Sequence, residues 1–210
     1  MYNYRYIYIY KMLNICKENT IEVAIDEVAR GCLFGRLYSA AVIWPIDFDN
    51  TKYNINDSKK LSKKKREELY DVIINNAIDW NVNFIEHDEI DKLNILQANM
   101  KSMHKNIDNL SLDIDHILVD GNYFKQYKNI EHTCVIKGDS KYCSIAAASI
   151  LAKVSHDRYI TELCNTYPDL QEKYDLLNNM GYPTKKHIEG IRKHGISKFH
   201  RKSYGICNNY

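Results

Sequence analysis

Short runs typical of strands alternate along this chain with longer segments of helical periodicity, and this alternation restricts the fold more than any other feature. Five runs rich in β-branched and aromatic residues span residues 22–26, 37–44, 82–86, 116–120 and 133–137. The first two flank a glycine-containing turn, so we expect them to pair as a hairpin. Strands and helices in this mixture predict an α/β protein with a central mixed sheet flanked by helices.

Two helices are predicted between these strands. Residues 62–77 begin with Ser62, a favourable N-cap, and place Leu69 and Ile73 on one face at helical spacing. A second apolar series has the period of an amphipathic helix and consists of Leu96, Met100, Met103, Ile107 and Leu110.

Two further helices follow the last strand. Residues 144–163 are rich in alanine and contain neither glycine nor proline, which favours one long helix. Thr184 and Gly195 are the expected start and stop residues of another. The C-terminal part of the chain is therefore predicted to be helical.

The length of 210 residues suits one domain. We expect residues 21–210 to form it and residues 1–20 to be a Tyr-rich tail or an extra edge strand. No apolar stretch approaches the ~18 residues of a membrane helix, and the six cysteines form no C-x-x-C pair. These features predict free thiols and a soluble, monomeric protein in the cytoplasm.

Charge is nearly balanced overall, because 29 basic side chains face 27 acidic ones. The net charge of +2 therefore says little about a nucleic-acid partner. Basic residues nevertheless gather in two stretches, 59–66 and 185–202, either of which is suited to contact phosphates. The first stretch is equally compatible with the polar face of a helix start.

Acidic residues follow three of the predicted elements. Asp26 and Glu27 end the first strand, Asp120 ends the fourth before Gly121, and Asp157 lies in the alanine-rich helix. In mid-strand Asp26 and Glu27 would point to opposite faces, but at a strand end both are expected to bend toward one ion. Oxygen-only ligands suit Mg²⁺ or Mn²⁺.

Several short motifs, taken together and in this order, resemble the type 2 ribonuclease H family, specifically ribonuclease HII. They include Asp26-Glu27, Val119-Asp120-Gly121, Lys137-Gly138-Asp139 and His200-Arg201-Lys202-Ser203, with further matches at residues 30–31, 57–62, 94–98, 144–154, 157–158, 181–182 and 184–187. The resemblance covers the chain from about residue 22 to residue 204. It implies a ribonuclease H-like fold and a catalytic domain over 21–210.

The resemblance also implies an activity. A member of this family is expected to hydrolyse the RNA strand of RNA-DNA hybrids and to cut on the 5′ side of a ribonucleotide embedded in duplex DNA, leaving a 3′-hydroxyl and a 5′-phosphate. Asp26, Glu27, Asp120 and Asp157 take the catalytic and metal-binding positions, with two Mg²⁺ or Mn²⁺ ions per site. Two ions can hold the attacking water and the leaving oxygen in line.

Substrate contacts are implied at other matching positions. The turn Ala29, Arg30 and Gly31 and the side chain of Tyr182 are expected to contact the 2′-hydroxyl that distinguishes RNA from DNA. The remaining expected substrate contacts are Lys59, Arg201 and Ser203. The partners would be RNA-DNA hybrids and duplex DNA that contains ribonucleotides, as in DNA replication and repair.

The chain departs from the family pattern at three positions. Ala29 replaces a glycine, and its Cβ disfavours a positive φ. Arg36 replaces a proline. His156 replaces an arginine and offers a cationic contact only when it is protonated.

Alternative interpretations remain at the level of sequence. Asp139 is expected to be a turn residue rather than a ligand, and the wide spacing of His187, His194, His200 and Cys207 disfavours a zinc site. For the whole chain, the alternatives are a DNA-cutting two-metal nuclease, a ribonuclease HIII-like preference for longer hybrids, and a hybrid-binding module without turnover.

Overall fold

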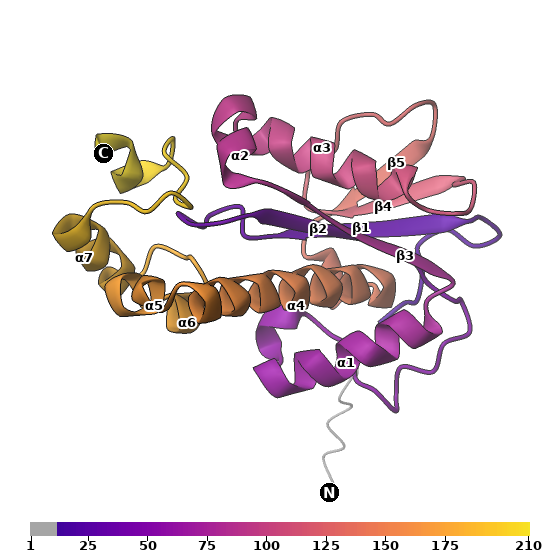
Figure 1. Ribbon diagram of the computed structural model, residues 1–210. Helices are drawn as coiled ribbons and strands as arrows, with labels where there is room; N and C mark the ends of the chain where they lie inside the picture. Colours follow the sequence, from indigo (N-terminus) through magenta and orange to yellow (C-terminus); the bar gives the residue numbers. More distant parts are fainter. Residues whose placement is uncertain (1–11) are drawn as a thin grey trace, which may run out of the picture.

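A five-stranded mixed sheet forms the centre of the molecule (Figure 1). The computed structural model describes residues 12–210, and its strands are β1 (Glu22–Val28), β2 (Leu37–Ile43), β3 (Asp79–Ile85), β4 (His116–Asp120) and β5 (Glu131–Val135). The strand order is β3-β2-β1-β4-β5. β1, β4 and β5 run parallel to one another, whereas β2 is antiparallel to β1 and to β3. The predicted mixed sheet and the pairing of its first two strands are confirmed.

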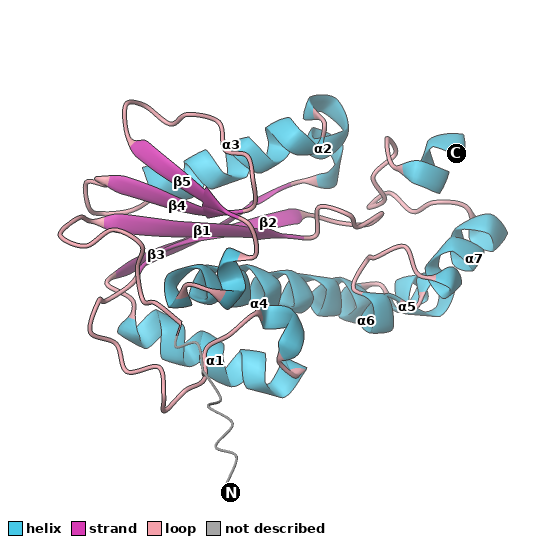
Figure 2. Ribbon diagram, turned by 180° about the vertical axis from the view of Figure 1, so that it is seen from behind, coloured by secondary structure: helices cyan, strands magenta, loops and turns pink. Residues whose placement is uncertain are grey.

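Helices cover both faces of this sheet. α1 (Lys63–Asn76) and the long α4 (Cys143–Thr166) lie on one face, and α2 (His87–Leu93) and α3 (Ile95–Asp108) lie on the other (Figures 1 and 2). α5 (Pro168–Tyr174), α6 (Leu176–Asn179) and α7 (Lys185–His194) gather at the far end of α4. Short 3₁₀ turns are η1 (Ser58–Lys60), η2 (Gly138–Ser140) and η3 (Gly205–Asn209). The helical C-terminal part is thus confirmed.

The alternation of side chains along β1 divides the core between the two helical layers. Val23 and Ile25 pack on the α3 side with Met103, whereas Ala24 packs against Ile145 of α4. Because side chains alternate with period two, the next residues continue this pattern. Asp26 therefore faces α4, and the residue after it faces α3.

The capping residues read from the sequence have the expected geometry. The hydroxyl of Ser62 accepts a hydrogen bond from the backbone N–H of Lys65 at 3.2 Å, and that of Thr184 accepts one from His187 at 3.4 Å. Gly195 ends α7 with a φ of 75°. These local rules hold because each hydroxyl satisfies an amide that has no partner within the first helical turn.

Some predicted bounds were wrong. β3 and β5 begin earlier than expected, at Asp79 and Glu131. Leu96 is 38% exposed, and Leu110 follows the end of α3, so neither belongs to the buried face of that helix. Three short helices, α2, α5 and α6, were not predicted, because segments of seven residues or fewer carry almost no periodic signal.

The predicted N-terminal segment 1–20 is described only from residue 12 onward, so its Tyr-rich part, residues 1–11, lies outside the described residues. Over 12–20 the chain is held against the domain. Leu13 forms a bridge with Tyr142, and the carboxylate of Glu22 accepts hydrogen bonds from the amides of Cys16 and Lys17. The domain boundaries stay a prediction.

All six cysteines lie in the described part of the chain and carry free thiols. Over residues 12–210, no helix combines the length and the apolar character needed to cross a bilayer.

Candidate active site

Two aspartates meet where the parallel strands β1 and β4 end. Ile25 pairs with Val119, so the next position on each strand is Asp26 and Asp120. The Asp120 carboxylate accepts a hydrogen bond at 2.7 Å from the backbone N–H of Gly138, which fixes its orientation. The carboxyl ends of parallel strands are the usual location of active sites in α/β sheets.

Asp26 is buried, with 4% of its surface exposed, on the α4 side of the sheet. Its carboxylate accepts hydrogen bonds from its neighbour's backbone N–H, at 2.7 Å, and from the hydroxyl of Ser149 on α4. Burial raises the pKa of Asp26 well above its ordinary value of 3.8, and the charges of Glu27 and Asp120 raise it further. Asp26 therefore carries a negative charge in this site only at a high electrostatic cost.

Glu27 is the next residue along β1, and its convergence with Asp26 on one ion stays a prediction. β1 continues to Val28, so Glu27 keeps the strand alternation and contacts Asn99 of α3. Arg30 forms an ion pair with it at 3.1 Å. Burial raises the pKa of Glu27, and the positive charge of Arg30 offsets part of this effect.

Asp139 lies in a turn, as expected, and is a further acid close to Asp120. It lies in η2, directly after Lys137, whose φ of 56° turns the chain back toward the strand ends. Only 4% of Asp139 is exposed. Burial and the charge of Asp120 raise its pKa, which indicates that the two carboxylates are close neighbours, and the Lys59 ammonium lies 3.7 Å from its Oδ2.

Asp157 is held differently from the other acids. Its carboxylate contacts Lys153 at 2.7 Å, His156 at 3.3 Å and Arg66 at 3.5 Å. Burial alone would raise its pKa, but the hydrogen bond from His156 and the charge of Lys153 outweigh burial and lower it. Asp157 follows Ser149 by eight residues on α4, which is about 12 Å along a helix axis. These contacts do not unite it with Asp26 and Asp120, and its role as a metal ligand stays a prediction.

The carboxylates have the chemistry of a site for a hard divalent cation, because oxygen ligands and uncompensated negative charge favour such an ion. Within residues 12–210, no three acidic, His or Cys side chains are arranged as they stand so as to hold one. Burial is the largest cause of the raised pKa values of Asp26 and Glu27, and the charge of Asp120 adds to both, so a bound cation would favour their charged forms.

A small cavity of about 200 Å³ opens beside the acids. It is lined by residues of β1 and the following turn, of η1, of α4 and of the loop before α7, namely Glu27, Val28, Ala29, Arg30, Gly31, Ser58, Lys59, Ser149, Lys153 and Tyr182. Of the predicted substrate contacts, the turn, Lys59 and Tyr182 therefore border one space. The Lys153 ammonium lies 5.8 Å from the centre of the Tyr182 ring.

The turn and Tyr182 are joined to each other. Ala29 has a φ of 71°, in the left-handed region that glycine adopts freely and other residues rarely do. Its backbone N–H donates to the Tyr182 hydroxyl, and its carbonyl accepts from the N–H of Cys32 at 3.3 Å. Burial is the largest cause of a raised Tyr182 pKa, so this hydroxyl stays protonated and can donate a hydrogen bond.

Two other predicted substrate contacts lie elsewhere. Arg201 is fully buried, and its guanidinium donates to the carbonyls of Gly35 and Ala29, at 2.9 and 2.8 Å, and to that of residue 30 at 3.1 Å. It therefore supports the turn and does not reach a substrate. The backbone N–H and the hydroxyl of Ser203 both donate to Asp91, so this serine fixes the C-terminal segment against α2.

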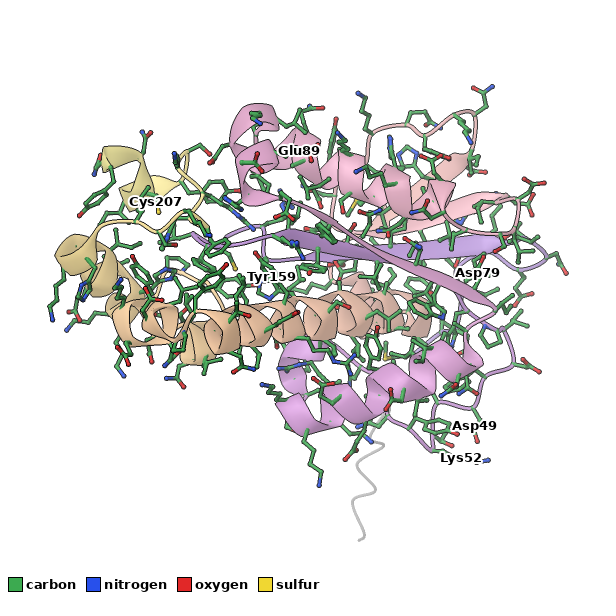
Figure 3. The ribbon with its side chains drawn as sticks, viewed as in Figure 1. Asp49, Lys52, Asp79, Glu89, Tyr159 and Cys207 are labelled. Carbon is green, nitrogen blue, oxygen red and sulfur yellow. The ribbon has the colours of Figure 1, made fainter. Side chains whose placement is uncertain are left out.

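The two other residues that depart from the family pattern, His156 and Arg36, make their contacts within the protein. His156 is fully buried, and burial lowers its pKa, so the protonated form that a cationic contact would require is disfavoured. Arg36 packs its guanidinium against the rings of Phe84 and Tyr159, at 4.0 and 4.4 Å, and pairs with Glu86 at 2.7 Å. Figure 3 shows Tyr159 on the side of α4 that faces the sheet.

The sheet order, the two helical layers and the acids at the strand ends define a ribonuclease H-like α/β hydrolase. The sequence pattern of the family described as Ribonuclease HII matches residues 23–207. The chain belongs to the ribonuclease HII family, whose members are endonucleases that hydrolyse RNA in RNA-DNA hybrids.

Individual relatives agree with this assignment. The chain is 50% identical over 195 residues to ribonuclease HII of Parabacteroides distasonis, covering 93% of this chain and 95% of that protein. The ribonuclease H2 structure from Pyrococcus horikoshii has the same fold, with a TM-score of 0.73 at 22% identity over 90% of this chain and 95% of that one. A structure of Bst ribonuclease HIII in complex with Mn²⁺ gives a TM-score of 0.62 at 19% identity, covering 83% of this chain and 62% of that one.

Proposed function

We propose that this protein hydrolyses the RNA strand of RNA-DNA hybrids and cuts duplex DNA on the 5′ side of a single embedded ribonucleotide. The observation that carries the proposal is that Glu27 borders one cavity with the Ala29–Gly31 turn and Tyr182, while Asp26, beside Glu27 on β1, and Asp120 on β4 follow the paired residues Ile25 and Val119. Chemistry on a phosphate and recognition of the neighbouring sugar thus share one site. The products would be a 3′-hydroxyl and a 5′-phosphate.

Asp26, Glu27 and Asp120 would hold divalent cations, for which Mg²⁺ and Mn²⁺ are the candidates. When bound, two such ions activate water and stabilise the leaving oxygen of the phosphodiester. The raised pKa values of Asp26 and Glu27 support the proposal, because negative charges that repel one another gain most from a bound cation.

Asp139 is the fourth acid that the contacts favour. It adjoins Asp120, whereas Asp157 already contacts the cationic Lys153 and Arg66. In this proposal Asp157 positions Lys153 at the cavity, and Asp139 completes the acidic cluster. The earlier assignment, with Asp157 as a ligand, remains the alternative.

The neutral and basic groups of the cavity would bind the substrate. The ammonium of Lys59, whose side chain is 80% exposed, and that of Lys153 are placed to contact phosphates. The ring of Tyr182 would pack on the sugar, while its hydroxyl and the amides of the turn meet the 2′-hydroxyl, which both donates and accepts hydrogen bonds.

The proposal is tested with three duplexes of one sequence: all DNA, DNA with one ribonucleotide, and an RNA-DNA hybrid. Cleavage products are mapped in the presence of Mg²⁺ and of Mn²⁺. We expect one cut on the 5′ side of the single ribonucleotide and none in the all-DNA duplex. Cutting of the hybrid alone would support a ribonuclease HIII-like preference, and binding without cutting would support a non-catalytic module.

The variants Asp139→Asn and Asp157→Asn test which of the two aspartates binds the cations. Both substitutions remove one negative charge and keep the size of the side chain. We expect Asp139→Asn to raise the Mg²⁺ concentration needed for half-maximal cleavage. Asp157→Asn is expected to leave that concentration unchanged and to weaken substrate binding, because Lys153 loses its partner. The opposite pattern would restore Asp157 as the ligand. The cytoplasmic location and the monomeric state stay predictions.

A further inference from the structure

The chain after α7 is basic in sequence but is buried where it passes the cavity. His200 and Arg201 are both fully buried, as is His187 on α7. Phe34, which follows the turn, forms a bridge with His200, and the N–H of Gly35 donates to the carbonyl of Phe199 at 2.9 Å. This segment therefore lies directly behind the residues that border the cavity.

His187 and His200 belong to one line of hydrogen bonds. The N–H of Ser197 lies 2.9 Å from Nδ1 of His200, the two Nε2 atoms lie 3.2 Å apart, and Nδ1 of His187 lies 2.9 Å from the carbonyl oxygen of Tyr182. The line connects the loop after α7 to the residue expected to contact the sugar.

Only one arrangement of protons satisfies all three contacts. The Ser197 N–H can only donate, so Nδ1 of His200 accepts, and neutral His200 then carries its proton on Nε2. Nε2 of His187 must accept that proton, which leaves Nδ1 of His187 as the donor to the Tyr182 carbonyl. The line is therefore directional and requires both rings to be neutral.

The surroundings keep both rings neutral. Burial lowers the pKa of His187, and burial with the nearby His187 lowers that of His200 to about 3. The ring of Tyr174 packs against both, at 6.0 and 4.7 Å, and Phe34 packs edge-on against His200. The titratable neighbour His87 also disfavours a charge on His200.

Arg201 acts on the other half of the same site. It binds the carbonyls of Ala29 and Arg30, and its own N–H donates to the carbonyl of Leu33 at 2.8 Å. The Leu33 N–H in turn donates to Gly181, the residue before Tyr182, at 2.9 Å. His200 and Arg201 are adjacent in the chain. Arg201 thus holds the turn, and His200 is linked through His187 to Tyr182.

We propose that His187, linked to His200, positions Tyr182 against the Ala29–Gly31 turn and so sets the preference for a ribonucleotide over a deoxyribonucleotide. This inference rests on the proposed function. His187 acts through the Tyr182 carbonyl and touches no substrate, so it is a positioning residue. Tyr182 is then held at both ends, by His187 at its carbonyl and by Ala29 at its hydroxyl.

Two variants of His187 separate this role from simple packing. In His187→Asn the amide nitrogen takes the place of Nδ1 and keeps the bond to Tyr182 but loses His200. In His187→Gln the amide reaches the place of Nε2, so the contact with His200 stays and the bond to Tyr182 is lost. The readout is the inhibition constant of an all-DNA duplex divided by the KM for the matching duplex with one ribonucleotide.

We expect His187→Gln to lower this ratio about threefold to tenfold, the effect of one hydrogen bond, and His187→Asn to leave it near the native value. The inhibition constant itself should stay unchanged, because phosphate contacts are untouched. Tyr174→Phe, which removes the hydroxyl bond to Gly195 at 3.0 Å in the same layer, is the control for stability and should not change the ratio.

Equal ratios for His187→Asn and His187→Gln would overturn the inference, as would a lowered ratio in Tyr174→Phe. Unfolding temperatures show whether each variant is folded. If His187→Gln does not fold while His187→Asn keeps the native ratio, Tyr182→Phe is compared with the native protein, and an unchanged ratio there also overturns the inference. A native protein that does not cut the ribonucleotide duplex would instead show that the proposed function fails.

Discussion

Ala29 carries a side chain in a left-handed backbone conformation, and its replacement by glycine gives the sharpest test of the turn. Its φ is 71° and it is 2% exposed. An L-residue in this region costs roughly 1–2 kcal/mol. Glycine removes that cost but loses about 0.8 kcal/mol from the buried methyl and roughly 0.5–1 kcal/mol from the greater freedom of the unfolded chain. Ala29→Gly should therefore be close to neutral in stability.

Ala24→Gly is the matched control, because Ala24 is a fully buried alanine with ordinary extended geometry in β1, the strand that leads into the turn. Ala24→Gly loses the buried methyl and gains freedom in the unfolded chain, as Ala29→Gly does, but it relieves no backbone strain. The free energy of unfolding, measured in urea, should be about 1–2 kcal/mol lower for Ala24→Gly than for Ala29→Gly, or roughly 2–8 °C in Tm. Equal destabilisation by the two substitutions would refute the reasoning that Ala29 is strained.

Three more outcomes are expected. Without divalent ions, the native protein should lose stability relative to Asp26→Asn as pH rises above 3.8. The reason is that the raised pKa of Asp26 makes the folded state bind more protons than the unfolded state. Parallel curves of unfolding free energy against pH for the two proteins would contradict this. Arg36→Ala should cost about 1–3 kcal/mol through lost contacts with Phe84 and Tyr159, and Arg36→Lys should restore only part of it, as urea unfolding would show. Gly190→Ala should prevent α7 from packing on α5, because its Cβ would lie 2.0 Å from the carbonyl oxygen of Lys173; a native Tm would exclude that clash.

Much of the fold was predictable because its long elements follow local rules. Ser62, Thr184 and Gly195 begin or end helices as their chemistry requires. The strands β1 and β4 were recognised because both are buried on two faces and read as continuous apolar runs. Short elements such as α6 depend on tertiary contacts, so their sequences give no periodic signal.

The site was predicted less completely, and the reasons are physical. Asp26 and Asp120 directly follow the last paired residues of two parallel neighbouring strands, which a sequence pattern can indicate. Asp139 comes close to Asp120 after a turn in which Lys137 takes a left-handed conformation, and nothing in the lysine side chain predicts that conformation. Arg201 was expected to contact the substrate, since a single sequence does not show that three backbone carbonyls surround its guanidinium.

The central claim is that the acids at the ends of β1 and β4 bind the cations that support hydrolysis. The most direct test is cleavage of a duplex with one ribonucleotide, with Mg²⁺ and with Mn²⁺, by the native protein and by Asp120→Asn at equal concentration. The account predicts that the native protein cuts and that Asp120→Asn loses nearly all activity while it remains folded. An Asp120→Asn variant that cuts as well as the native protein would contradict it.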